Sequence, residues 1–260
     1  MSRSNTRHII VTGGSSGIGF EVARQLAVKG NNVSIIARNP QMLERACENL
    51  RRSAPNSIFS ASADVTRPDE LIAAIGACQK NFGPCDVLIT SAGIVEPAFF
   101  DQLHPAQFQA QMDTNFFGTV NAVRAVYSDM KARRSGSIMM ISSAAAFIGI
   151  PGYTAYCASK SALASFAESL RSEAGGDVHI GISFPPDTQT PQFEQEIPKR
   201  SESAKTLMGN DVPWPVDKVA HHIVNGIYRR QYEVHFGLKL RLLNLLGNLI
   251  KPLLYRRLRG

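Results

Sequence analysis

The sequence predicts a single α/β domain built on a doubly wound parallel sheet of about seven strands. Short runs rich in Val and Ile alternate along the chain with segments whose apolar residues recur at helical spacing. Alternation of this kind is typical of parallel sheets that carry helices on both faces. With 260 residues, of which 44% are hydrophobic and 19% charged, the chain is long enough for one large core.

Each predicted element follows from this pattern, in chain order. The predicted strands lie at residues 8–12, 33–37, 58–63, 86–90, 137–142 and 178–184, with a shorter one at 232–236. Helical periodicity predicts helices at 18–28, 42–52, 70–81 and 155–173. We expect one domain at residues 1–236, including a substrate loop at 185–214, followed by a basic amphipathic tail at 237–260.

The first predicted strand runs directly into the glycine-rich turn TGGSSGIG, residues 12–19. Glycines let the backbone turn tightly and approach a pyrophosphate, and the helix that follows offers free N–H groups to the anion. A strand before the turn and a helix after it are the context that a Rossmann nucleotide site requires, although a plain structural turn is the alternative. The residues that we predict to contact the cofactor here are Gly13, Ser15, Ser16, Gly17, Ile18 and Gly19.

The end of the second predicted strand indicates which dinucleotide binds. A site for NAD needs a carboxylate at this point for the ribose 2′-hydroxyl, whereas a 2′-phosphate needs a guanidinium and no carboxylate. Ala37 and Arg38 meet the second condition. We therefore predict NADPH, with Ser15 as a further donor to the phosphate. The alternative is an ordinary surface arginine at the start of a helix.

Tyr156 and Lys160 lie four residues apart in a predicted helix, so they share one face. An ammonium group beside a phenol favours the phenolate, and we expect Lys160 to lower the pKa of Tyr156 below its usual value of about 10. Tyr156 would then be a usable proton donor. Ser143 adds a hydroxyl at the end of the fifth predicted strand, where the edge of the sheet should open onto the cofactor.

Taken together and in order, these motifs resemble the short-chain dehydrogenase/reductase family across residues 8 to about 236. The resemblance rests on TGGSSGIG, Asp64-Val65, Ser91-Ala92-Gly93, Asn115, Ser143 and the stretch YCASK at 156–160. It implies a catalytic tetrad of Asn115, Ser143, Tyr156 and Lys160, and cofactor contacts from Asp64, Val65, Ser91, Ala92 and Gly93. The family usually has Asn where this chain has Ser91. Whether the serine gives the same structural support as the amide of that Asn is left open.

The same resemblance implies that a ketone is reduced. Tyr156 would protonate the carbonyl oxygen and Ser143 would hydrogen-bond it, while NADPH supplies the hydride. Lys160 would also hold the nicotinamide ribose. Asn115 would position a water that returns protons toward Lys160.

The loop FPPDTQTP, residues 184–191, leaves the sixth predicted strand and carries two prolines where the family usually has Pro-Gly. A second proline fixes φ and removes a donor, so the loop should leave the strand in one direction. The loop resembles that of the 3-ketodihydrosphingosine reductases within the family. This implies reduction of 3-ketosphinganine to sphinganine, and cofactor contacts from Pro185, Thr188 and Thr190. A merely rigid turn is the alternative.

The tail has no acidic residue from Phe236 to Gly260 and holds six of the seven surplus positive charges of the chain. At most nine residues separate Arg241 from Lys251, which is too short to span a bilayer. One helical face would carry Leu242, Leu245, Leu246, Leu249, Leu253 and Leu254. This pattern fits membrane-surface contact through residues 238–258, and packing on the body or on a partner subunit is the alternative.

Several partners are excluded by composition. Outside the tail the chain is nearly neutral, so we expect no nucleic acid, and its four cysteines have no metal spacing, so we expect no metal site. The polar N-terminus predicts no signal peptide, so we expect a cytoplasmic protein. If the tail contacts a membrane, the protein would be peripheral on its cytoplasmic face. The family resemblance implies a homo-oligomer. The alternatives in function are reduction of another lipophilic ketone (a 3-oxoacyl thioester, a steroid or a retinoid), a non-catalytic NADP(H) sensor, and a membrane scaffold.

Overall fold

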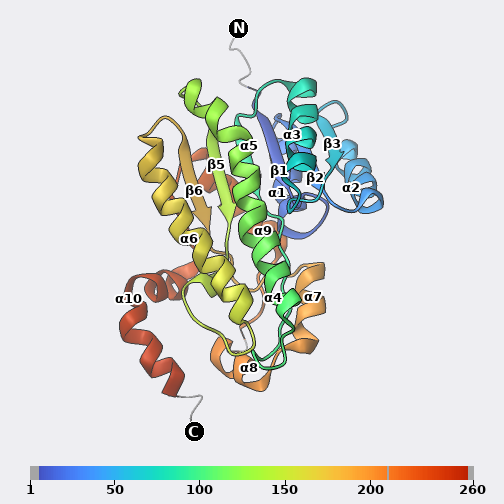
Figure 1. Ribbon diagram of the computed structural model, residues 1–260. Coiled ribbons are helices and arrows are strands. Elements are labelled where there is room, and N and C mark those ends of the chain that lie inside the picture. Colours follow the sequence, from blue (N-terminus) through green and yellow to red (C-terminus); the bar gives the residue numbers. More distant parts are fainter. Residues whose placement is uncertain (1–5, 210, 257–260) are drawn as a thin grey trace.

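The computed structural model describes residues 6–209 and 211–256, and its centre is one parallel sheet (Figure 1). The strand order is β3-β2-β1-β4-β5-β6-β7, and every neighbouring pair is parallel. The strands are β1 (His8–Thr12), β2 (Asn32–Ala37), β3 (Ile58–Ser62), β4 (Val87–Thr90), β5 (Ser137–Ile141), β6 (His179–Ser183) and β7 (Glu233–Val234). All seven predicted strands are confirmed, with ends that differ by at most two residues.

The helices connect these strands and extend beyond them. They are α1 (Gly17–Val28), α2 (Pro40–Ser53), α3 (Pro68–Phe82), α4 (Pro105–Met112), α5 (Gly118–Ala132), α6 (Thr154–Ala174), α7 (Pro191–Glu196), α8 (Glu202–Met208), α9 (Val216–Tyr228) and α10 (Gly237–Arg256). A π-helical turn, Asp113–Phe117, joins α4 directly to α5. The four helices that we predicted are present as α1, α2, α3 and α6.

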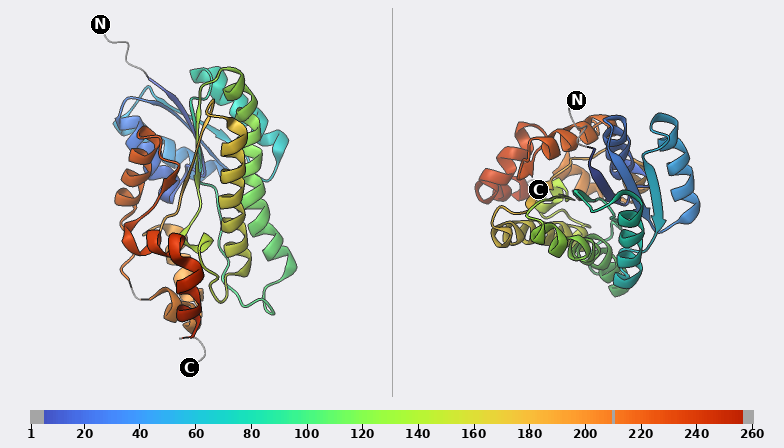
Figure 2. Two further views of the ribbon diagram at one scale, coloured as in Figure 1. Left: turned by 90° about the vertical axis from the view of Figure 1, so that its left-hand side faces the viewer. Right: turned by 90° about the horizontal axis from the view of Figure 1, so that it is seen from above.

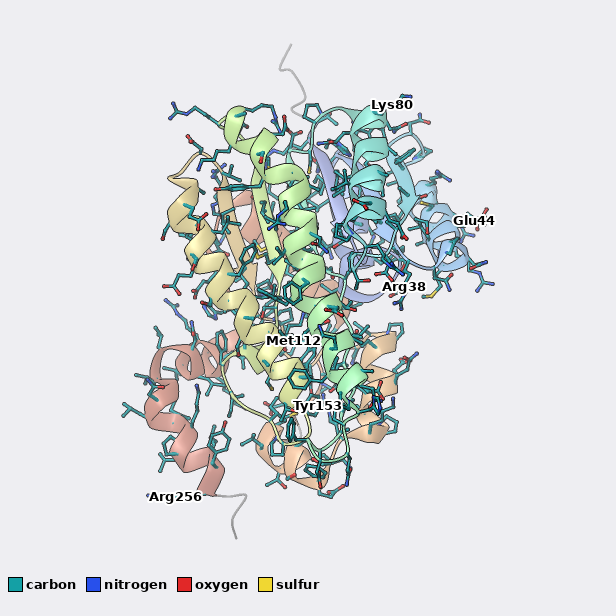
Figure 3. The ribbon with its side chains drawn as sticks, in the orientation of Figure 1. Arg38, Glu44, Lys80, Met112, Tyr153 and Arg256 are labelled. Atoms are coloured by element: carbon teal, nitrogen blue, oxygen red, sulfur yellow. The ribbon has the colours of Figure 1, made fainter. Side chains whose placement is uncertain are left out.

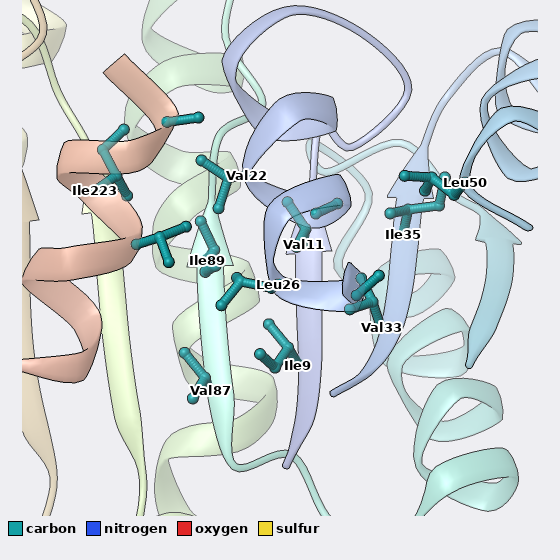
Figure 4. Packing of buried hydrophobic residues seen from close by; sticks show 14 of the residues in the cluster. Ile9, Val11, Val22, Leu26, Val33, Ile35, Leu50, Val87, Ile89 and Ile223 are labelled. Atoms are coloured by element: carbon teal, nitrogen blue, oxygen red, sulfur yellow. The ribbon is translucent and has the colours of Figure 1, made fainter. Parts of the chain in front are cut away.

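Two layers of helices cover the two faces of the sheet, as the side view in Figure 2 shows. One core packs α1, α2 and α9 against the sheet, and the close-up in Figure 4 shows part of it, with Val22 and Leu26 between Ile223 and Ile9. The other core packs α3, α5 and α6 on the opposite face, around Ile10 and Leu88. Because both faces are covered, the central strands are buried along their whole length, which explains their continuous Val and Ile runs.

The strand order reverses between β1 and β4. The chain adds β2 and β3 on one side of β1, and then adds β4 and the later strands on the other side. Loops that leave two such strands diverge, and the crevice between them at the carboxyl ends of the strands is where ligands bind in folds of this kind. Helices α7, α8 and α10 lie beyond these carboxyl ends (Figure 1). The fold therefore places the carboxyl end of the sheet under a cover formed by the two short helices α7 and α8 and the longer α10.

The predicted tail is largely helical. Helix α10 is kinked at Leu246 and contains Pro252. The end of the predicted tail, residues 257–260, lies outside the described residues, as do residues 1–5. No helix within residues 6–209 and 211–256 has both the length and the apolar character that a bilayer span would need.

Candidate active site

A cleft of about 320 Å³ opens at the switch point between β1 and β4. Most of the predicted cofactor residues line it, although they come from six separate stretches of the chain. These are Gly13, Ser15, Ser16, Gly17, Ile18, Arg38, Asp64, Val65, Ser91, Ala92, Gly93, Tyr156, Lys160 and Thr190. The structure thus brings together the glycine turn, the end of β2 and the start of α6 around one elongated space.

The glycine turn is held against the loop that follows β4. Gly13 has a φ of +70°, and a Cβ there would lie 2.5 Å from the backbone nitrogen of Ala92. A Cβ at Gly19 would lie 2.4 Å from the carbonyl oxygen of Gly13, so Gly19 serves the packing of the turn and does not line the cleft. Ser91, which stands where the family has Asn, bonds the turn through its backbone N–H, 3.0 Å from the carbonyl oxygen of Thr12.

Arg38 lies at the end of the cleft near α2, with 70% of its side chain exposed (Figure 3). Its nearest acidic neighbour is Asp64, at 3.6 Å between Nη1 and Oδ2. Burial acts to raise the pKa of Asp64, but hydrogen bonds from Thr66 and the charge of Arg38 outweigh it and lower the pKa. An exposed guanidinium held by one ionised carboxylate can still accept a phosphate in the cleft.

Lys160 lies one helical turn after Tyr156 on α6, as the spacing predicts, and it is buried. Its Nζ donates to the carbonyl oxygen of Ile141, 3.1 Å away at the end of β5, and lies 5.6 Å from the centroid of the Tyr156 ring. Burial lowers the pKa of Lys160 from its ordinary 10.5 to about 8. The ammonium group therefore sits on the floor of the cleft, close to the phenol ring.

Our expectation for the pKa of Tyr156 is wrong for this state of the protein. Burial raises the pKa of Tyr156 well above its ordinary value, and the negative charges of Glu196 and Asp187 raise it further. A hydrogen bond with Ser143 acts in the opposite direction but is outweighed. The i, i+4 spacing placed Lys160 correctly, but the loss of water around both groups has a larger effect than their proximity.

Ser143 and Asn115 take different positions around this pair. Ser143 follows β5, and its Oγ accepts a hydrogen bond from the N–H of Ala145 at 3.1 Å. Asn115 is fully buried in the π-helical turn and does not line the cleft. Its Nδ2 donates to the carbonyl oxygen of Ile94 and to the Oγ of Ser159, while its Oδ1 accepts from the N–H of Ile94.

The oxygen of Asn115 and the ammonium of Lys160 nevertheless face the same space. A Cβ at Gly93 would lie 3.3 Å from Asn115 Oδ1 and 3.6 Å from Lys160 Nζ. Both hydrogens of the Asn115 amide are already used. Only its oxygen can therefore contact a molecule that approaches Lys160 over Gly93, and the role of Asn115 in holding a water stays a prediction.

A second cavity of about 480 Å³ lies beside the cleft, and Tyr156 lines both. Ser143, Pro185 and Thr188 line this second cavity rather than the nucleotide cleft, so the predicted cofactor contacts of Pro185 and Thr188 stay predictions. Much of the remaining wall is apolar and comes from α8 and α10. Those side chains are Leu207, Met208, Leu240, Leu243 and Leu254.

A charged network that the sequence did not reveal fixes the loop after β6. Arg200 donates to both carboxylate oxygens of Asp187, at 2.6 and 2.8 Å, and to Oε1 of Glu196 at 2.7 Å. The hydroxyl of Tyr153 donates to the same Oε1 at 2.7 Å. Figure 3 shows Tyr153 beyond the carboxyl ends of the strands. Asp187 thus anchors the double-proline loop. The one sign of this role in the sequence is that Asp187 is the only charged residue in the segment 184–191.

The predicted leucine face of the tail mostly points away from the body. Leu242, Leu245, Leu246, Leu249 and Leu253 are exposed, and Leu249 reaches 72%. Leu254 is the exception, because it lines the second cavity. The hydroxyl of Tyr255 ties the end of α10 to the body by donating to the carbonyl oxygen of Gly149 and accepting from its N–H. For most of these leucines, the alternative that they pack on the body of the protein is therefore wrong.

Comparison with known proteins gives relatives over most of the chain. It is 36% identical over 236 residues to a 3-dehydrosphinganine reductase of Arabidopsis thaliana, a match that covers 88% of this chain and 70% of the relative. It is 34% identical to an 11-beta-hydroxysteroid dehydrogenase of Arabidopsis thaliana, covering 87% of this chain and 67% of the relative. The crystal structure of an actinorhodin polyketide ketoreductase with NADPH superimposes with a TM-score of 0.78 at 25% identity, covering 87% and 92% of the two chains.

The family whose description is short chain dehydrogenase matches residues 7–201, which include the glycine turn, Asn115, Ser143, Tyr156 and Lys160. The match therefore spans well over half of the chain and all four residues of the predicted tetrad. Together with the relatives, it settles the class of the protein: the chain belongs to the short-chain dehydrogenase family.

Proposed function

We propose that the protein reduces 3-ketosphinganine (3-ketodihydrosphingosine) to sphinganine with NADPH, as one step of sphingolipid synthesis. The main support is the second cavity, which meets the nucleotide cleft at Tyr156 and has leucines of α10 in its wall. A long-chain ketone needs both features, a proton donor beside the cofactor and an apolar channel for its chain. The relative from Arabidopsis thaliana named 3-dehydrosphinganine reductase supports the same assignment.

The residues of the cleft fit NADPH. The first turn of α1 and the glycine turn offer backbone N–H groups to a pyrophosphate, and Arg38 offers a guanidinium to a 2′-phosphate. Lys160 would hold the nicotinamide ribose at the other end of the cleft. When bound, NADPH supplies the hydride that reduces the carbonyl carbon.

The chain's own groups handle the oxygen of the ketone. Tyr156 donates the proton, and its raised pKa keeps it in the protonated form until negative charge develops on that oxygen. Ser143 hydrogen-bonds the same oxygen. Lys160 is close enough to the ring to stabilise the phenolate that remains, and Asn115 supports the path by which a proton returns.

The experiment that tests this function is an assay of the purified protein with NADPH against 3-ketosphinganine, a steroid ketone and an acetoacetyl thioester. We expect turnover of 3-ketosphinganine with a kcat/KM at least tenfold above that of the others. The steroid is the second candidate, because a relative at 34% identity is named an 11-beta-hydroxysteroid dehydrogenase. Turnover of the steroid alone would refute the assignment, and no turnover of any ketone would favour a non-catalytic NADP(H) sensor.

The exposed leucine face of α10 supports a finer proposal, that a cytoplasmic enzyme rests on an anionic membrane and takes its substrate from it. Lys239, Arg241 and Lys251 lie on the same helix, which has no acidic residue. Sedimentation with vesicles of phosphatidylserine and phosphatidylcholine should pull down the wild type. It should not pull down Leu245→Glu/Leu249→Glu.

Equal sedimentation of both forms would contradict membrane contact. We also propose a homo-oligomer, and light scattering of the wild type and of Leu245→Glu/Leu249→Glu would test whether this face packs on a second copy instead.

We further propose that residues 1–236 carry the reaction and that residues 237–260 bring the substrate to it. Helix α10 also closes part of the cavity, so removing 237–260 should lower turnover of long-chain ketones most.

A further inference from the structure

The cavity beside Tyr156 contains an unbalanced negative charge. Four charged residues line it: Asp187, Glu196, Asp211 and Lys239. Asp211 and Lys239 form an exposed pair at 3.0 Å near the mouth, so their charges cancel. Asp187 uses both of its oxygens on Arg200. Glu196 also pairs with Arg200, so within the described residues one positive charge serves two carboxylates.

Glu196 is also only half satisfied in its hydrogen bonds. The donors that reach it, from Tyr153 and Arg200, all end on Oε1. Among the described residues, no donor bonds Oε2, although only 12% of the side chain is exposed. Because Glu196 lines the cavity, a substrate that fills the cavity would displace water from this oxygen, and the loss is unfavourable unless the substrate supplies a donor of its own. A cationic donor suits a carboxylate oxygen best.

The position of Glu196 relative to Tyr156 limits which part of a substrate could supply that donor. The ring of Tyr153, whose hydroxyl bonds Glu196, lies 6.3 Å from the ring of Tyr156. The negative charge of Glu196 is close enough to Tyr156 to raise the pKa of its phenol. A cation bound at Glu196 would therefore sit close to the carbonyl that Tyr156 protonates.

We propose that Oε2 of Glu196 binds a protonated amine on the carbon next to the reacting carbonyl, so that Glu196 selects 2-amino ketones over neutral ketones. The inference rests on the proposed function, and it identifies the residue that recognises the polar end of that substrate. Tyr153 and Arg200 hold the carboxylate in place, and the apolar wall from α8 and α10 takes the hydrocarbon chain. A steroid ketone has no such amine and would leave Oε2 of Glu196 without a donor.

The test measures kcat/KM of the full-length enzyme with NADPH for two ketones of equal chain length. One is 3-ketosphinganine, and the other is its analogue without the 2-amino group. In Glu196→Gln the ratio of the two values should fall by about 10- to 100-fold, mainly through KM for the amine, as expected for loss of a charge-assisted hydrogen bond. Any change in the acidity of Tyr156 acts on both ketones and cancels in the ratio.

Glu194→Gln is the matched control, because Glu194 lies on the same short helix but is exposed, and its ratio should equal that of the wild type. An unchanged ratio in Glu196→Gln would overturn the inference. If this variant does not fold, inhibition of the wild type decides: sphinganine should inhibit at least tenfold more strongly than its deamino analogue, and equal inhibition would overturn the inference. A wild type that reduces neither ketone would refute the proposed function instead.

Discussion

Replacing Lys160 by methionine should stabilise the fold at pH 7. Burial lowers the pKa of Lys160 from 10.5 to about 8, and at about 1.4 kcal/mol per pH unit this difference corresponds to about 3 kcal/mol of unfavourable free energy for the charged group in the folded protein. Losing the hydrogen bond to Ile141 offsets about 1 kcal/mol of the gain. We therefore expect the free energy of unfolding to rise by about 1–2 kcal/mol.

The sign of the pH dependence follows from the same shift. Below about pH 8 the folded and unfolded states both carry the proton, and the full penalty is present. Between pH 8 and 10.5 the folded state releases the proton first, so the stability of the wild type rises with pH relative to that of the variant. The difference between the two proteins should shrink by about 1 kcal/mol from pH 7 to pH 9.

Urea denaturation at pH 7 and pH 9, followed by the fluorescence of Trp214, measures both quantities. Lys131→Met is the matched control, because the Nζ of Lys131 also donates to a backbone carbonyl, that of Glu173, but at an exposed position. Its stability should change by less than about 0.5 kcal/mol. A Lys160→Met variant that is less stable than the wild type by the same margin at both pH values would refute the reasoning.

Three further predictions concern catalysis, cofactor choice and packing. Tyr156→Phe should lower kcat by about 10²–10⁴-fold and leave NADPH binding, measured by fluorescence titration, unchanged; retained turnover would exclude Tyr156 as the proton donor. Arg38→Ala should raise KM for NADPH by at least about tenfold and leave KM for NADH unchanged, whereas an equal change in both would assign Arg38 a merely structural role. Gly19→Ala should lower the free energy of unfolding by about 1–3 kcal/mol or more in urea, because its Cβ would meet the carbonyl oxygen of Gly13.

The sequence predicts those features of the site that depend on neighbours along the chain. Strands buried on both faces read as continuous apolar runs, so β1 to β6 could be placed to within a few residues. The spacing of Tyr156 and Lys160 and the glycines of the first turn likewise fix local geometry. Parallel topology then gathers these pieces at one edge of the sheet.

Features that depend on contacts far apart in the sequence could not be predicted. The acidity of Tyr156 is set by how much water the folded chain removes from it. Arg200 pairs with Asp187 across 13 residues of short helices, and that separation has no periodic signal. Helices α4 and α5 were not predicted, and the structure shows them joined through a π-helical turn that breaks the α-helical repeat.

That turn has a consequence for the length of the helix in which it lies. A π-helical turn closes its hydrogen bonds over five residues where an α-helical turn uses four, so residues 113–117 hold one residue more than a regular helix would. Deleting one of these residues would let the turn close as a regular α-helix, with the helical faces before and after it kept in phase. The residues of the turn itself would change position, among them Asn115, which bonds Ile94, whereas Gln111, which bonds Glu96 of the same loop, lies before the turn. The extra residue therefore serves the position of Asn115 against that loop, and the regular packing of the helices does not require it.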